Sequence, residues 1–143
     1  MSSKTIKHQK IKIYTDGGAR GNPGPAGIGV VVYDIDDNII NTKSEYIGKA
    51  TNNQAEYMAV VAAMELIARY EVEEINFFLD SELVVKQLNR EYKVKNKGLA
   101  PLFVKVYNSI LKYKKVTFTH IRREFNKEAD KLANIAMDKA KIL

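Results

Sequence analysis

The sequence predicts an α/β fold in which helices cover both faces of a five-stranded mixed β-sheet. Three strand patterns follow one another without a helix between them, as in an antiparallel meander. Helix and strand patterns then alternate, as in units whose parallel strands are joined by right-handed crossovers. A chain of 143 residues suits one domain, so we expect a flexible tail at residues 1–9 and a single domain at residues 10–143.

The strands are indicated by alternating side chains and by short apolar runs. Residues 10–16 alternate between apolar and polar side chains. The glycine-rich stretch at 17–27 predicts a turn between this strand and the next. The largely apolar run INFFL at 75–79 suits a buried central strand. The predicted strands are residues 10–16, 28–33, 39–48, 75–79 and 116–120.

Four stretches combine apolar residues at helical spacing with residues suited to begin a helix. Asn52 or Asn53 can cap the first helix, and Ser81 the second. Pro101 opens the third helix, and Asn126 can cap the last. The predicted helices are residues 53–70, 81–90, 101–113 and 126–141.

Composition limits the classes of function. The net charge of +6 favours an anionic partner such as nucleic acid, although a basic surface that only maintains solubility explains the same charge. The absence of cysteine excludes disulfides and thiolate metal sites, but not hard cations held by oxygen ligands. Neither a signal-peptide pattern nor an apolar run of membrane-spanning length is present, so we expect a cytoplasmic monomer without membrane contact.

Four carboxylates occupy positions where solvation is difficult. Asp16 ends the first predicted strand, and Asp80 directly follows the buried apolar strand. Glu56 falls within the apolar arc of its helix, and Asp130 lies at the edge of the apolar stripe of the last helix. Taken singly, each can be explained as a turn, cap or helix-dipole residue. Taken together, they would repel one another unless a cation such as Mg²⁺ or Mn²⁺ neutralised them.

A carboxylate metal site on a basic domain suggests phosphodiester chemistry but does not identify a substrate. Two divalent ions held by such a site would clamp both the attacking and the leaving oxygen of a phosphodiester.

Four motifs that contain these carboxylates follow one another along the chain. They are YTDGGARGNPGPAGIGVVV at residues 14–32, TNNQAEYMA at 51–59, FLDSELVVKQL at 78–88 and NKEADKLAN at 126–134. In this order they resemble the motifs of type 1 ribonuclease H in its compact bacterial and archaeal form, over residues 10–141. The resemblance implies a ribonuclease H-like fold with strand order 3-2-1-4-5. It also implies endonucleolytic hydrolysis of the RNA strand of RNA–DNA hybrids.

The resemblance implies a role for each carboxylate as a catalytic and metal-binding residue. Asp16 would bridge two Mg²⁺ ions, for which Mn²⁺ could substitute. Asp130 would help to hold the ion that activates the attacking water, and Glu56 and Asp80 the ion at the leaving 3′ oxygen. The products would then carry 5′-phosphate and 3′-hydroxyl ends.

Nucleic-acid contacts are implied at six further residues. Asn22, Asn52 and Asn53 would read the 2′-hydroxyl, the group that separates RNA from DNA. Their structural alternatives are turn formation for Asn22 and helix capping for the other two. A pocket for a DNA-strand phosphate would use Thr51, Lys49 and Asn96.

Two features depart from better-known members of the family. His120 lies too early for the family's loop histidine, so we expect it to be a structural residue at a strand end. The basic helix of some members is missing, and we expect Lys93, Lys95 and Lys97 to replace it in part, although an ordinary solvated loop explains these lysines as well. Two alternatives stay open: a catalytically silent nucleic-acid-binding module, or the same chemistry with cleavage of double-stranded RNA or of single embedded ribonucleotides.

Overall fold

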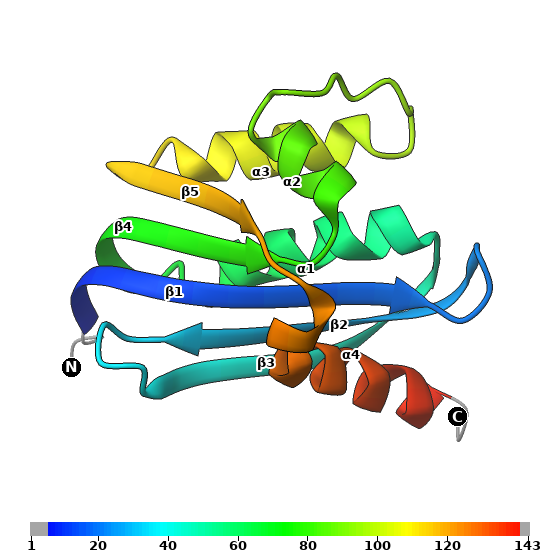
Figure 1. The fold of residues 1–143 in the computed structure, drawn as a ribbon, viewed down its shortest axis with the longest axis horizontal. Coiled ribbons are helices and arrows are strands. Elements are labelled where there is room, and N and C mark those ends of the chain that lie inside the picture. Colours follow the sequence, from blue (N-terminus) through cyan, green and yellow to red (C-terminus); the bar gives the residue numbers. More distant parts are fainter. Residues whose placement is uncertain (1–5, 141–143) are drawn as a thin grey trace.

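A computed structural model of the protein describes residues 6–140, which form one five-stranded sheet with helices on both faces (Figure 1). The strand order β3-β2-β1-β4-β5 confirms the order that the resemblance implied. β1 pairs antiparallel with β2 and parallel with β4, and the edge strands β3 and β5 are antiparallel and parallel to their neighbours. The strands are β1 Ile6–Ala19, β2 Gly24–Tyr33, β3 Ile39–Ala50, β4 Tyr70–Leu79 and β5 Lys115–His120.

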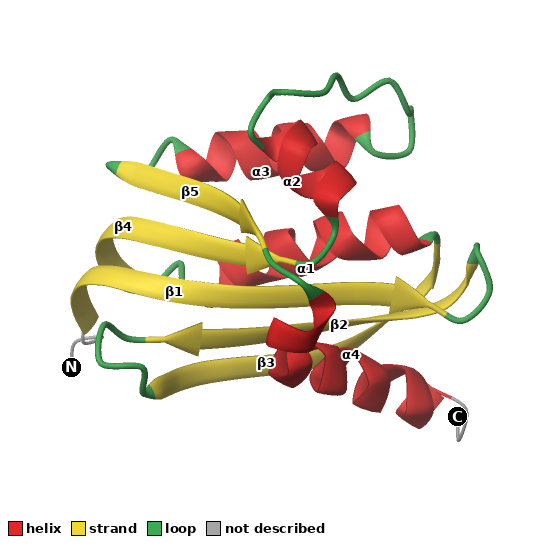
Figure 2. Cartoon of the chain, viewed as in Figure 1, coloured by secondary structure: helices red, strands yellow, loops and turns green. Residues whose placement is uncertain are grey.

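The helices divide between the two faces of the sheet (Figure 2). Apolar side chains of α1, α2 and α3 join those of the strands in the main hydrophobic core, whereas α4 covers the opposite face beside β2 and β3. The helices are α1 Asn52–Leu66, α2 Glu82–Leu88, α3 Ala100–Ile110 and α4 Lys127–Ala140, with a short 3-10 turn at Arg123–Phe125. No helix within residues 6–140 is long and apolar enough to cross a membrane.

Three strands begin four or more residues earlier than predicted. β2 starts at Gly24 and β1 continues to Ala19, so the turn predicted at 17–27 is confined to residues 20–23. β1 starts at Ile6 and β4 at Tyr70, because the two strands pair in parallel from these residues onwards. Residues 6–9 therefore belong to the sheet and not to the predicted tail, of which residues 1–5 lie outside the described part. Their polar side chains obscure the alternation in the sequence. An ion pair between Lys7 Nζ and Glu71 Oε2, at 3.8 Å, joins the two segments instead.

The first helix also differs from its prediction at both ends. Its N-cap is Thr51, and not Asn52 or Asn53. Thr51 Oγ1 accepts a hydrogen bond from Gln54 N at 3.1 Å, and Gln54 Oε1 accepts one from Thr51 N at 2.9 Å. The helix ends at Leu66, four residues before the predicted end, because the chain then turns into β4.

The core lies between the sheet and α1. Ile13 of β1 and Phe77 of β4 are register partners and are fully buried, as the apolar patterns predict. Phe77 stacks on Phe118 of β5 with ring centroids 5.2 Å apart. Tyr57 of α1 is buried as well, and its hydroxyl donates to Gln87 Oε1 at 2.7 Å. This packing fixes α1 and the central strands as one frame.

The other face of the sheet receives α4 at very close range. A Cβ at Gly29 of β2 would overlap the carbonyl oxygen of Ala129 and lie 2.8 Å from Ala133 N. The backbone of α4 therefore approaches the backbone of β2 as closely as only glycine permits. This contact sets the position from which α4 presents Asp130.

We predict that Gly29→Ala destabilises the protein by about 1–3 kcal/mol, because the added methyl group forces α4 away from β2. Urea unfolding of the two proteins measures the difference. Gly18→Ala is the matched control, since a Cβ there meets nothing closer than Met137 Cε at 3.8 Å. Equal loss of stability in the two variants would contradict this explanation.

Candidate active site

The parallel pairing of β1 with β4 brings two carboxylates to the same end of the sheet. Tyr14 is the register partner of Phe78, and Asp16 and Asp80 each lie two residues further along. Asp80 directly follows Leu79, the last residue of β4. The two acids therefore lie next to each other where the central strands end.

Two helices bring the other carboxylates to this place. Glu56 belongs to α1 and Asp130 to α4, on opposite faces of the sheet. One oxygen from each of Asp16, Glu56 and Asp80 lies within 4.8 Å of the others. Asp130 borders the same pocket as these three. The structure thus gathers all four acids that the sequence singled out.

A glycine holds β1 against α1. A Cβ at Gly17 would overlap the carbonyl group of Ala55, so only glycine allows this approach. The Gly17 N–H donates to Glu56 Oε1 at 2.5 Å and to Asp16 Oδ1 at 3.0 Å. One oxygen of each acid is therefore fixed by the same backbone group.

Burial sets the electrostatics of this pair. Asp16 is 9% exposed and Glu56 is 6% exposed. Burial raises the pKa of Asp16 from 3.8 to about 7; a hydrogen bond with Glu56 lowers it, while Asp80 and Asp130 raise it. Burial, followed by the charge of Asp16, also raises the pKa of Glu56 well above its ordinary value.

The residues present fit a divalent cation. Glu56 Oε2 is buried, and within the described residues it has no hydrogen-bond partner. The acidic cluster offers only carboxylate oxygens, the donors that Mg²⁺ and Mn²⁺ prefer. A cation bound there would satisfy the unpaired oxygen and offset the repulsion within the cluster.

Asn126 supports the site in a way that sequence reasoning missed. We expected its side chain to cap the last helix, which does begin at the next residue. Its Nδ2 instead donates to Asp80 Oδ2 and to the carbonyl oxygen of Thr15, both at 2.8 Å. Asn126 is 1% exposed, and its own carbonyl oxygen accepts from Asp130 N at 3.1 Å. The sequence pattern predicts that a helix starts near Asn126, but it does not predict where the Asn126 side chain points.

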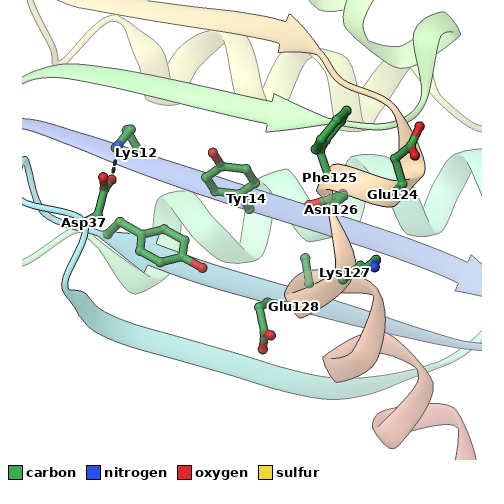
Figure 3. A pocket seen from close by; sticks show the side chains of 10 residues that line it. Lys12, Tyr14, Asp37, Glu124, Phe125, Asn126, Lys127 and Glu128 are labelled. Atoms are coloured by element: carbon green, nitrogen blue, oxygen red, sulfur yellow. Dashed lines mark hydrogen bonds and ion pairs between the residues drawn. The ribbon is translucent and has the colours of Figure 1, made fainter.

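Asn126 also borders a second hollow, on the part of the sheet that α4 leaves uncovered (Figure 3). Tyr14 forms its floor, stacked on Phe78 with ring centroids 4.8 Å apart. Lys12 pairs there with Asp37. None of the four clustered carboxylates lines this hollow, so it is distinct from the acidic pocket.

Two of the predicted nucleic-acid contacts, Asn52 and Asn53, lie at the start of α1, and Asn22 lies in the β1–β2 connection beside them. Asn52 and Asn53 border the acidic pocket. Asn52 Oδ1 accepts from Ala19 N at 2.8 Å, and Asn52 N donates to Asn22 Oδ1 at 3.0 Å. These bonds fasten the β1–β2 connection to α1, so Asn22 and Asn52 have a structural task whether or not they read a ribose.

The other three lie outside the pocket lining. Thr51 caps α1, and Lys49 is exposed near the end of β3. Asn96 Oδ1 accepts from Gly98 N at 2.7 Å, and a Cβ at Gly98 would lie 3.1 Å from Gln54 Nε2. The loop that carries Asn96 therefore approaches the start of α1, beside the residue that completes its capping box.

The chain between β5 and α4 adds a positive group to the pocket. His120 is exposed at the end of β5 and is not among the pocket-lining residues. Arg123, in the 3-10 turn, does line the pocket. This placement agrees with the expectation that His120 is a strand-end residue.

Comparisons with known proteins identify the family. A family model described as reverse transcriptase-like matches residues 14–136. A ribonuclease H from Ruthia magnifica is 34% identical over 91% of this chain and 97% of its own length. The chain belongs to the ribonuclease H family.

Two further proteins are similar to this chain over most of its length. LC11-RNase H1, isolated from compost and solved in complex with RNA/DNA hybrid, is 46% identical with a TM-score of 0.87, over 91% of this chain and 98% of that one. A bifunctional protein of Mycobacterium tuberculosis is 39% identical over 92% of this chain. The chain spans only 36% of that protein's length.

We predict that Asp16→Asn stabilises the metal-free protein at pH 7.5, by an amount that shrinks towards pH 4.5. Because the folded-state pKa of about 7 exceeds the unfolded value of 3.8, the native state binds more protons than the unfolded state between these values. Wild-type stability therefore falls as pH rises through this window, by on the order of a few kcal/mol. The variant loses the part of this dependence that Asp16 contributes, while the buried Glu56 still contributes its own part.

Thermal unfolding in EDTA at the two pH values measures the effect. Glu65→Gln, which removes an exposed carboxylate from the same helix that carries Glu56, is the control and should show a small and pH-independent change. A variant that is less stable than the wild type at pH 7.5 would show that Asp16 is not held at an energetic cost.

Proposed function

We propose that this chain is a metal-dependent endonuclease that hydrolyses the RNA strand of RNA–DNA hybrids to 5′-phosphate and 3′-hydroxyl ends. The observation that carries the proposal is the gathering of Asp16, Glu56 and Asp80 within 4.8 Å, with Glu56 Oε2 buried and unpaired. Relatives named ribonuclease H, and the hybrid bound by one of them, support the choice of substrate.

In this proposal the four carboxylates hold two Mg²⁺ ions, or Mn²⁺ as a substitute. Asp16 would contact both ions, Asp130 would serve the side of the attacking water, and Glu56 and Asp80 the side of the leaving oxygen. When bound, such ions supply the positive charge that activates water and stabilises the leaving oxygen.

The protein's own groups would orient the acids and the substrate. The Gly17 N–H holds one oxygen of Asp16 and one of Glu56. Asn126 holds Asp80 from the other side. Because these contacts come from the protein's own groups, they orient the acids for cation binding.

Recognition of the hybrid is proposed at the start of α1. Asn22, Asn52 and Asn53 would contact the 2′-hydroxyl groups of the RNA strand beside the acidic pocket. Thr51 and Lys49, with Asn96 from the facing loop, would hold a phosphate of the DNA strand. The excess of lysine and arginine over acidic residues favours this polyanion, and binding should weaken as salt increases.

We predict that Asp80→Asn folds normally and loses hybrid cleavage by several orders of magnitude, because an amide is a poor ligand for a hard cation. Labelled RNA–DNA hybrid, RNA duplex and DNA duplex are compared under one Mg²⁺ condition. Glu82→Gln, two residues away and exposed, is the control and should cleave like the wild type.

Full activity of Asp80→Asn would contradict the assignment of the site. A wild-type protein that binds hybrid without cutting it would instead identify a silent binding module. Cleavage of the RNA duplex at a comparable rate would widen the substrate class to double-stranded RNA.

We predict that Asn126→Ala lowers hybrid turnover by about 10–100-fold, because Asp80 loses the donor that orients it. Asn89→Ala is matched to it, since Asn89 Nδ2 donates to the carbonyl oxygen of Phe118 at 3.0 Å, away from the acidic pocket. Asn126→Ala should lose about 1–3 kcal/mol of stability, and Asn89→Ala less, because the Asn89 side chain is exposed. Steady-state kinetics and urea unfolding separate the two effects, and equal turnover in both variants would refute the role of Asn126.

A further inference from the structure

Arg20 joins the β1–β2 connection to the far half of α4. Its backbone N–H donates to the carbonyl oxygen of Pro25 at 2.8 Å, which fixes the turn. Its side chain reaches α4, where Nη1 contacts Asp138 Oδ1 at 2.5 Å and Nη2 donates to Asn134 Oδ1 at 3.3 Å. Figure 1 shows that this connection and the C-terminal half of α4 lie at the same end of the sheet.

Asn134 continues this contact to the acidic cluster. Its Nδ2 donates to Asp130 Oδ1 at 3.3 Å and to the carbonyl oxygen of Asp130 at 3.0 Å. Asp130, Asn134 and Asp138 are spaced four residues apart and so share one face of α4. Arg20 and Asn134 both border the acidic pocket beside Asp130. A continuous chain of hydrogen bonds therefore runs from Asp138 through Arg20 and Asn134 to Asp130.

The donors and acceptors of these groups fix the direction of each hydrogen bond in this series. An arginine side chain has only donors, so it must meet the carbonyl end of the Asn134 amide. The NH₂ end of that amide is then directed at the Asp130 carboxylate, which can only accept when ionised. Without Arg20, the amide oxygen would lose this charged donor, and only the two bonds of its NH₂ group to Asp130 would hold the amide.

We propose that Arg20 is a positioning residue that fixes the Asn134 amide, and through it the Asp130 carboxylate, for cation binding. The inference rests on the proposed role of Asp130 as a metal ligand. Because Arg20 acts from two hydrogen bonds away, it orients Asp130 without neutralising it by direct contact.

The Arg20–Asp138 ion pair lies at the surface end of these hydrogen bonds. An effect of Arg20 on the orientation of Asp130 can therefore be distinguished from an effect on stability. The Arg20 and Asp138 side chains are 33% and 65% exposed. Pairs of this kind add little to the stability of a protein. A variant at Arg20 should therefore fold like the wild type, and any change in cation binding would report on orientation.

The test uses Arg20→Met, which keeps most of the apolar stem and removes the donors, together with Asn134→Ala and the double variant. Each ¹⁵N-labelled protein is titrated with Mg²⁺ alone, and the backbone amide signals of Gly17 and Asp130 are followed. Lys114→Met is the control, because it removes another exposed ion pair, the one between Lys114 and Glu73. This pair lies beside the first residue of β5, whereas His120 is the last residue of that strand.

We expect the Mg²⁺ concentration at half-saturation to rise about tenfold in Asn134→Ala and roughly threefold in Arg20→Met. The double variant should match Asn134→Ala, because Arg20 acts only through the amide. The Mg²⁺ dependence of hybrid cleavage should shift in parallel, with KM for hybrid at saturating Mg²⁺ unchanged. Lys114→Met should titrate like the wild type.

Unchanged Mg²⁺ titration in Arg20→Met would overturn the proposal, as would additive effects in the double variant. A raised KM for hybrid with normal Mg²⁺ binding would likewise overturn it and make Arg20 a direct substrate contact. Failure of the wild-type protein to cleave hybrid would refute the proposed function, whereas the Mg²⁺ titration tests the positioning role independently of cleavage.

Discussion

The burial of two mutually repelling acids is the constraint on which the rest of this structure depends. Asp16 and Glu56 lie side by side with little exposure to water, and their raised pKa values record what that placement costs. A carboxyl group in such surroundings would normally move towards solvent or acquire a basic partner. Here the packed frame of the sheet and α1 holds both acids in place.

Close backbone approaches convert that frame into a site. Gly17 lets β1 touch α1, and Gly29 lets α4 touch β2, on opposite faces of the sheet. Each of the two helices carries one acid, Glu56 and Asp130, towards the ends of the central strands. Both approaches bring backbone atoms of a helix next to backbone atoms of a strand, so a larger residue at either glycine would displace the helix. The geometry of the acidic pocket therefore depends on these two close approaches.

The sequence was most informative where one-dimensional patterns reflect burial. The apolar run at 75–79 predicted the buried part of β4, and the motif order led to the correct strand order. It was least informative where partners are distant in the chain. The first residues of β1 form a strand only because β4 pairs with them, and their own pattern is polar.

Side-chain direction was the other limit. The sequence marked Asn126 as a helix-start residue. Its side chain, however, points towards Asp80, which lies 46 residues earlier in the chain, and no local pattern reveals that partner. Similarly, Thr51 and not its asparagine neighbours caps α1, because Gln54 returns the hydrogen bond. Both cases involve a choice among polar residues that local propensity ranks as nearly equal.

The choice of donors around the acids explains how the pocket stays receptive to cations. The groups that hold the carboxylates directly are neutral: the Gly17 N–H, the Asn126 amide and the Asn134 amide. A lysine or arginine at any of these positions would neutralise the acid and compete with a metal ion for its oxygens. Neutral donors orient a carboxylate while leaving its charge in place. The fold thus combines preorganised acids with neutral hydrogen-bond donors, an arrangement that suits the binding of hard divalent cations.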